Sequence, residues 1–204
     1  MGTVELDRSP AVGALFGRAA LGVIRLPPRR RRPAALPGTA YARRGVRVDR
    51  AHLAAYDRVC GFRLTDALPA TYPHVLAFPL ALKLMAGADF PFPLAGILHV
   101  ANRIEVRRPV DAGEPLDLAV SAADLRPHER GRQVDLIAVA SVAGEEVWRG
   151  VSTYLHREGG GGDRRRGPLS VVAPPAASAS WRVLPRVGTA YAAVSGDHNP
   201  IHTS

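Results

Sequence analysis

Apolar and polar residues begin to form regular patterns near Tyr41. The first strand candidate covers 45–48. Asp49 follows it as a suitable N-cap for a helix over 51–59, and Gly61 is placed to end that helix. This part of the chain therefore predicts one short strand followed directly by a helix.

A longer apolar run over 74–85 predicts a buried helix, because its charge is confined to Lys83 and Pro79 suits a first helical turn. Over 116–123 the pattern has a period of two, as in a strand with one buried face. The strand candidates after the helix are 97–106, 116–125, 133–142 and 145–156. These elements predict an α+β protein with an antiparallel sheet wrapped around a central helix, which is the hotdog arrangement.

Composition divides the chain into four segments. Residues 1–38 form a basic arm, and 39–157 hold the elements described above. Residues 158–180 contain runs of glycine and arginine and a Pro/Ala/Ser tract, which is typical of a linker. Apolar content returns at Trp181, so 181–204 begin a second structured unit.

The formal net charge of +9 lies almost entirely in the first quarter of the chain. Residues 1–50 hold eleven arginines against three acidic residues. The run Arg29–Arg32 is of a kind that can contact nucleic acid or anionic lipid. Because no aromatic residue is interleaved with it, we interpret the run as a solvated lead-in and expect no nucleic-acid partner.

The sequence also bears on the cellular compartment. It has no run of about 18 apolar residues, so we expect no membrane span. Cys60 is the single cysteine, which excludes a disulfide within these residues and agrees with a reducing cytoplasm. We therefore expect a cytoplasmic protein.

A short internal repeat relates the two structured units. Residues 54–62 align with 189–197 at a constant offset of 135, so that Tyr, Val and Gly coincide and Cys60 faces Ser195. Both copies lie at the start of a structured unit. The repeat therefore predicts two units of similar fold.

The two copies differ in residues that can transfer protons. The second has Asp197 where the first has Phe62, and His202 where the first has Ala67. The first unit is therefore predicted to lack residues that can transfer protons, and the second is predicted to be catalytic.

The end of the chain carries the most specific signal. Residues 191–204 read YAAVSGDHNPIHTS. This stretch resembles the signature of the MaoC-like dehydratases and R-specific enoyl-CoA hydratases (hydratase 2), in which a helix ends at Gly-Asp-x-Asn-Pro and a histidine follows two residues later. The resemblance implies that Asp197 and His202 are the catalytic pair. Residues 41–156 also resemble the non-catalytic N-terminal hotdog of the two-hotdog hydratases.

The residue types suit such chemistry independently of the family. Hydrating a 2-enoyl thioester requires a group that takes a proton from water and one that delivers a proton to Cα, which a carboxylate and an imidazole can share. Gly196 permits a tight turn, and Pro200 prevents the helix from continuing. Ser195 and Asn199 are placed to support the resulting loop.

The resemblance implies a hydro-lyase of fatty acid metabolism that acts reversibly on fatty acyl-CoA or acyl-carrier-protein thioesters, without a metal or redox cofactor. It also implies a homodimer or pairing with another hotdog chain. The competing hypothesis is a non-catalytic acyl-CoA-binding or assembly subunit. By the length of the first copy, the second unit would extend to about residue 290, so 181–204 would be only its beginning.

Other readings of the polar residues are weaker. His198 and His202 have the spacing of metal ligands, but Pro200 breaks the helix that would align them. Ser195 lacks the Gly-x-Ser-x-Gly frame of a nucleophile elbow. Cys60 is interpreted as a structural thiol.

His74 is interpreted as a structural histidine, and His99 shares no motif with an acidic partner. Residues 181–204 are expected to lack a fold of their own and to order only by docking on 39–157 or on another chain. Asp197 and His202 would then be largely exposed, without an enclosing pocket.

Overall fold

The computed structural model describes residues 2–15, 33–94, 96–157, 179–180, 182 and 185–197. Its elements are, in chain order, β1 (Gly2–Glu5), β2 (Thr39–Val46), α2 (Arg50–Cys60), α3 (Tyr72–Met85), β3 (Ile97–Val106), β4 (Leu116–His128), β5 (Gly131–Val142), β6 (Glu145–Arg157) and α4 (Val187–Ser195). The linker segment 158–178 and the run Arg29–Arg32 lie outside the described residues.

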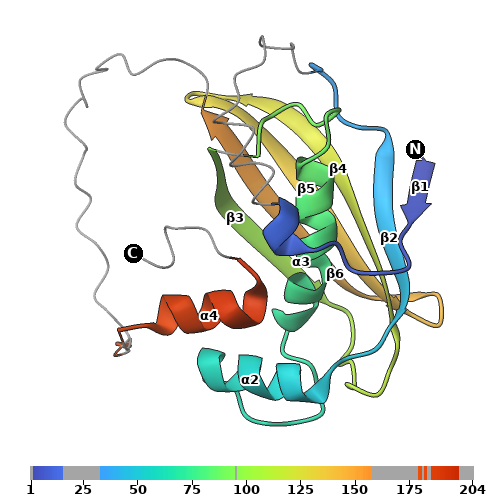
Figure 1. The fold of residues 1–204 in the computed structure, drawn as a ribbon, viewed down its shortest axis with the longest axis vertical. Coiled ribbons are helices and arrows are strands. Elements are labelled where there is room, and N and C mark those ends of the chain that lie inside the picture. Colours follow the sequence, from blue (N-terminus) through green and yellow to red (C-terminus); the bar gives the residue numbers. More distant parts are fainter. Residues whose placement is uncertain are drawn as a thin grey trace.

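The strands form one sheet in the order β1-β2-β4-β5-β6-β3. Every neighbouring pair is antiparallel except β1 and β2, which run parallel. The sheet curves around α3, and α2 and α4 lie side by side at one end of it (Figure 1). The predicted α+β hotdog fold is therefore confirmed.

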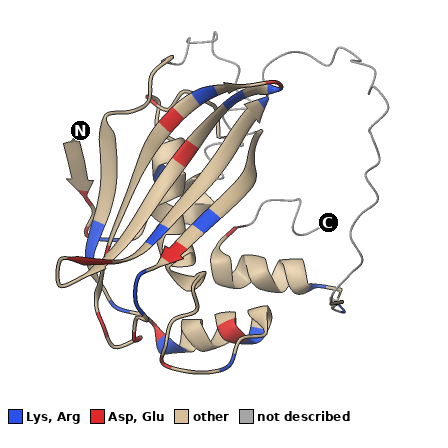
Figure 2. Cartoon of the chain, turned by 180° about the vertical axis from the view of Figure 1, so that it is seen from behind, with Lys and Arg blue, Asp and Glu red and all other residues tan. Residues whose placement is uncertain are grey.

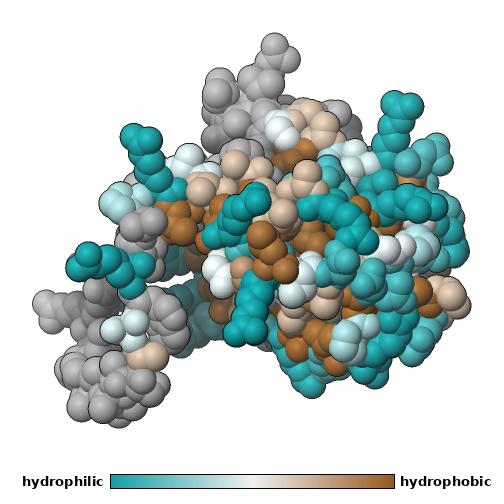
Figure 3. All heavy atoms as spheres, turned by 90° about the horizontal axis from the view of Figure 1, so that it is seen from below, coloured by the Kyte–Doolittle hydropathy of each residue, from teal (hydrophilic) through white to brown (hydrophobic). Residues whose placement is uncertain are grey.

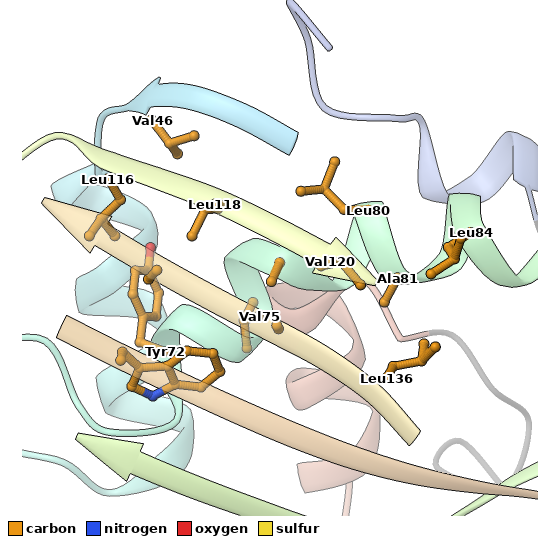
Figure 4. Close-up of a cluster of buried hydrophobic side chains, with 14 of the residues drawn as sticks. Val46, Tyr72, Val75, Leu80, Ala81, Leu84, Leu116, Leu118, Val120 and Leu136 are labelled. Carbon is orange, nitrogen blue, oxygen red and sulfur yellow. The ribbon is translucent and has the colours of Figure 1, made fainter. Parts of the chain in front are cut away.

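The core lies between α3 and the inner face of the sheet. Alternate residues of β4 point inward, and Leu116, Leu118 and Val120 are each at most 1% exposed. They meet Val75 and Leu80 of α3 (Figure 4). Burying a side chain of this size contributes roughly 1.5–3 kcal/mol, so the period-two pattern read from the sequence carries much of the fold's stability.

Two details of the predicted elements are wrong. The first strand covers Thr39–Val46 instead of 45–48, because its pairing with β4 begins upstream and shifts register between Arg43 and Val46, where Gly45 has φ 59°. Pro79 lies inside α3, and it is Pro73 that occupies the first turn. The helix continues through Pro79, at the cost of one backbone hydrogen bond, because both ends are held in the core.

The beginning of the basic arm belongs to the sheet. Gly2–Glu5 pair with Thr39–Ala42, and the Glu5 carboxylate accepts a hydrogen bond from Arg44 at 3.0 Å. Residues 2–5 of the arm are therefore an exposed edge strand. The reason is that β2 would otherwise present an unpaired edge, which the first residues of the chain cover.

Charged residues of the strands are largely paired with one another. Glu146 accepts hydrogen bonds from Arg107 at 2.8 Å and from Arg149 at 2.6 Å, which lowers the pKa of its carboxyl group. Arg126 pairs with Asp135 in the same way. Figure 2 shows these charges spread along the sheet, whereas α4 carries none. Exposed pairs contribute only about 0–1 kcal/mol each.

The end of the molecule with α2 and α4 has a mixed surface. Phe62, Leu64 and Val187 are 44%, 58% and 38% exposed. From below, hydrophobic atoms lie among hydrophilic ones (Figure 3). Among the described helices none is long and apolar enough to cross a membrane.

Candidate active site

The helix that precedes the signature docks on the first unit. α4 packs beside α2, and the rings of Tyr191 and Tyr56 lie 6.4 Å apart between their centroids. Ala192, Val194 and Ser195 are buried by this packing. The expectation that 181–204 order by docking on 39–157 is met for α4, which spans nine residues.

The two copies of the repeat have the same helix end. Gly61 and Gly196 both adopt a left-handed conformation with φ 73°, and each donates its N–H to the carbonyl four residues earlier. A residue with a side chain is strained at such a φ, which explains why both copies have glycine there. Tyr56 and Tyr191 then face each other because the two helices pack as a pair.

Asp57 marks a difference between the paired helices. It is 1% exposed, its Oδ1 accepts no hydrogen bond within the described structure, and burial raises the pKa of its carboxyl group. The repeat places Ala192 at the equivalent position of α4, and that residue is also 1% exposed. An ionised carboxylate at this position therefore costs stability.

Replacing Asp57 with Ala should raise the free energy of unfolding by about 1 kcal/mol at pH 7, because it removes an unsatisfied buried acceptor and favours the helix. The pKa of Asp57 in the folded state lies above its unfolded value of 3.8. The loss of stability caused by the ionised carboxylate therefore appears as pH rises through that value. The gain should therefore shrink at pH 3. Thermal unfolding at both pH values measures it, and a variant less stable than wild type at pH 7 would contradict it.

Asp197 follows directly on the left-handed glycine. Its backbone N–H donates to Ser195 Oγ at 3.1 Å, and Ser195 is only 7% exposed. Ser195 thus supports the turn, as its position in the motif suggested. Asn199, Pro200 and His202 lie outside the described residues, so their roles stay predictions.

A cavity of about 240 Å³ opens beside Asp197. Its walls come from α3, β3, β6, α4 and the segment before β3, and its lining residues are His74, Val75, Phe78, Leu82, Met85, Leu94, Ile97, Leu98, His99, Tyr154, Tyr191, Ser195 and Asp197. The expectation that Asp197 would lack an enclosing pocket is wrong. The reason is that α4 docks onto the first unit and brings its own C-terminal end against α3 and β3.

Two histidines of the first unit line the same cavity. His74 lies in the first turn of α3 and His99 on β3, and their rings stack with centroids 6.1 Å apart and planes 15° apart. His99 in turn stacks on Tyr154 of β6 at 4.8 Å. The first unit is therefore not bare of groups that can transfer protons. Sequence reasoning missed this, although a histidine inside a predicted buried helix was the available signal.

Burial controls the ionisation of this column of rings. It lowers the pKa of His74 to about 4, an effect that His99 reinforces and the Asp197 carboxylate opposes. Desolvation by its ring neighbours also lowers the pKa of His99, although the residue is exposed on the edge strand β3, and a hydrogen bond with the Ala101 backbone and the Asp197 carboxylate oppose this shift. It raises the pKa of Tyr154 far above the ordinary value, and Asp197 adds to this. Near pH 7 both imidazoles and the phenol are therefore neutral.

Replacing His74 with Asn should make the fold less sensitive to acid. The unfolded histidine titrates near 6.5 and the folded one near 4, so the unfolded chain binds more protons between these values. Stability is lost as pH falls through this window, by at most about 3 kcal/mol from His74. Urea unfolding at pH 7 and pH 4.5 measures the loss, with His128→Asn as control. Equal losses in the His74 variant and wild type would refute the expectation.

Cys60 lies at the end of α2 and is partly buried. Burial raises the pKa of its thiol, so it stays protonated near neutral pH, in keeping with a structural role. Within the described ranges no cluster of three or more His, Cys, Asp or Glu side chains could hold a metal ion, and His198 and His202 lie outside those ranges.

Comparison with known proteins identifies related dehydratases. No profile of a known protein family matches it. It is 38% identical over 189 residues to 3-hydroxyacyl-thioester dehydratase X of Mycobacterium tuberculosis, covering 92% of this chain and 66% of that protein. The crystal structure of HtdX from the same organism superposes with a TM-score of 0.67 at 37% identity, covering 80% of this chain and 63% of HtdX.

A MaoC-like dehydratase from Phytophthora capsici superposes with a TM-score of 0.56 at 19% identity over 80% of this chain and 62% of its own, which shows a shared fold. The chain thus spans just under two thirds of the length of these relatives. This degree of identity along nearly all of the chain agrees with the hotdog sheet and with the helix that is followed by Gly196 and Asp197. The chain is therefore a relative of the 3-hydroxyacyl-thioester dehydratases, and it shares the hotdog fold of a MaoC-like dehydratase.

Proposed function

We propose that the whole protein is a (3R)-3-hydroxyacyl-thioester dehydratase, and in the reverse direction an R-specific 2-enoyl-CoA hydratase. The observation that carries this proposal is the position of Asp197, whose carboxylate lines a largely apolar cavity directly after the left-handed end of α4. The 38% identity to a 3-hydroxyacyl-thioester dehydratase supports the same reaction.

Asp197 and His202 are proposed to share the proton transfers. In hydration one of them removes a proton from water as its oxygen bonds to Cβ, and the other delivers a proton to Cα on the same face. Dehydration reverses both steps. A carboxylate and an imidazole suit this exchange because their ordinary pKa values lie below and near neutrality. Ser195, Gly196, Asn199 and Pro200 are proposed to hold the loop that carries the pair.

The proposed substrate is a fatty acyl thioester of coenzyme A or of acyl-carrier protein, in the cytoplasm. The apolar side of the cavity, formed by residues such as Val75, Phe78 and Leu82, suits an acyl chain. Adding water involves no net oxidation or reduction, so we propose that the reaction uses no redox cofactor. We also propose that it uses no metal, because Asp197 and His202 supply the acid and the base. Pairing with a second copy or with another hotdog chain is part of the same proposal.

The test is the loss of the conjugated enoyl-thioester absorbance when the whole protein is given a trans-2-enoyl-CoA. The configuration of the product is read with dehydrogenases specific for (3R)- or (3S)-hydroxyacyl-CoA. We expect turnover to the (3R) product that a metal chelator leaves unchanged. No turnover on enoyl-CoA or enoyl-acyl-carrier-protein, or a (3S) product, would refute the proposal.

The non-catalytic alternative is not favoured. It rested on a first unit without proton-transfer groups, whereas His74 and His99 of that unit line one cavity with Asp197. Its remaining prediction is that acyl-CoA binds without turnover, and the assay above reads that outcome directly.

A further inference from the structure

The stacked rings of His74, His99 and Tyr154 line the proposed site, and the nitrogen-bearing edge of His74 is the polar group considered first. His74 lines the cavity that Asp197 also lines, and no hydrogen bond of its imidazole to another described residue is found. A partly buried imidazole normally satisfies at least one ring nitrogen. A polar group of a molecule in the cavity could satisfy such a nitrogen of His74.

The rest of the column fixes the position of the His74 ring. His99 and Tyr154 are direct partners across β3 and β6, so both side chains lie on the same face of the sheet. The β3–β6 register shifts immediately after His99, so Val100 is an extra residue, and such bulges re-aim neighbouring side chains. His99 therefore supports the flat face of His74 while leaving its edge to the cavity.

The ionisation state agrees with a role in hydrogen bonding. Because burial lowers its pKa to about 4, His74 is a neutral imidazole near pH 7, with one N–H donor and one acceptor nitrogen. The Asp197 carboxylate acts on His74, His99 and Tyr154 alike, which places it near the column. A neutral imidazole can therefore donate a hydrogen bond to, or accept one from, an oxygen next to Asp197.

We propose that His74 is a substrate-binding residue that hydrogen-bonds the β-oxygen of the acyl thioester, water in hydration and hydroxyl in dehydration, with His99 and Tyr154 as positioning residues. The inference rests on the proposed function for the identity of the substrate. It assigns to the first unit a direct contact with the reacting end of the substrate.

The test compares two ligands that differ only in this oxygen. In the whole protein with Asp197→Asn, which blocks turnover, calorimetry measures the dissociation constants of a (3R)-hydroxyacyl-CoA and of the saturated acyl-CoA of equal length. We expect His74→Phe to reduce the preference for the hydroxylated ligand about threefold to tenfold, as loss of one neutral hydrogen bond predicts. His74→Asn, which keeps a donor and an acceptor, should restore part of it.

His128→Phe is the matched control, since it removes an imidazole from the β4–β5 end of the sheet. An unchanged preference in His74→Phe, with both ligands still bound, overturns the proposal, and so does an equal loss for both ligands. The readout is independent of catalysis. A wild-type protein without turnover would therefore refute the proposed function, while the ligand preference would still decide the role of His74.

Discussion

Replacing Asp197 with Asn should lower kcat of the whole protein by about 10²- to 10⁴-fold, the range that one general acid–base group supplies. The amide keeps nearly the shape of the carboxylate, so the turn between Ser195 and Asp197 should persist. We therefore expect KM to change far less than kcat. Steady-state hydration of a trans-2-enoyl-CoA measures both constants, and His202→Gln should behave in the same way.

Asp124→Asn is the matched control for this experiment. Asp124 is exposed on β4, pairs with Arg126, and lies outside the cavity. Its φ of 50° is one that asparagine tolerates, so the fold should not change. The assignment of Asp197 would be wrong if its variant kept kcat within a factor of about three of this control.

Replacing Trp148 with Ala should lower the free energy of unfolding by about 3–5 kcal/mol, the usual cost of removing a large aromatic side chain from a core. Trp148 is 1% exposed, and its Nε1 donates to the Ala70 carbonyl at 2.7 Å. Its ring also lies against Gly150, where a Cβ would come within 2.5 Å of it. The backbone around this ring should therefore fill only part of the space that the alanine substitution leaves.

Urea unfolding followed by circular dichroism measures this effect. Trp148→Phe serves as the comparison, because it keeps most of the apolar volume and loses the hydrogen bond to Ala70. We expect it to cost about 2 kcal/mol. An alanine variant within 1 kcal/mol of the phenylalanine variant would show that packing around Trp148 matters less than we infer.

Local patterns in the sequence determined the elements of the fold. The apolar run over 74–85 and the alternation over 116–123 report burial directly, since the side chains of a helix or strand repeat with a fixed period. The predicted helices correspond to α2 and α3, and the predicted strands after them to β3 through β6. The position of Asp197 after a helix that ends at glycine was likewise readable, because the glycine requirement is local.

Contacts between distant segments were decided only by the tertiary structure. Nothing near Gly2 indicates that it joins a strand edge at Thr39, and nothing near Pro79 indicates that packing carries α3 through a proline. Such outcomes depend on the free energy of packing, which overrides local preference when an element is held from both sides.

The same distinction applies to the site. The signature identified Asp197, and the repeat aligned Gly61 with Gly196, which adopt the same φ of 73°. No local pattern joins His74 and His99 to Asp197, because α3, β3 and α4 meet only when β3 pairs with β6 and α4 docks beside α2. A motif specifies chemical groups along the chain, whereas the cavity that gathers them exists only after those long-range contacts have formed.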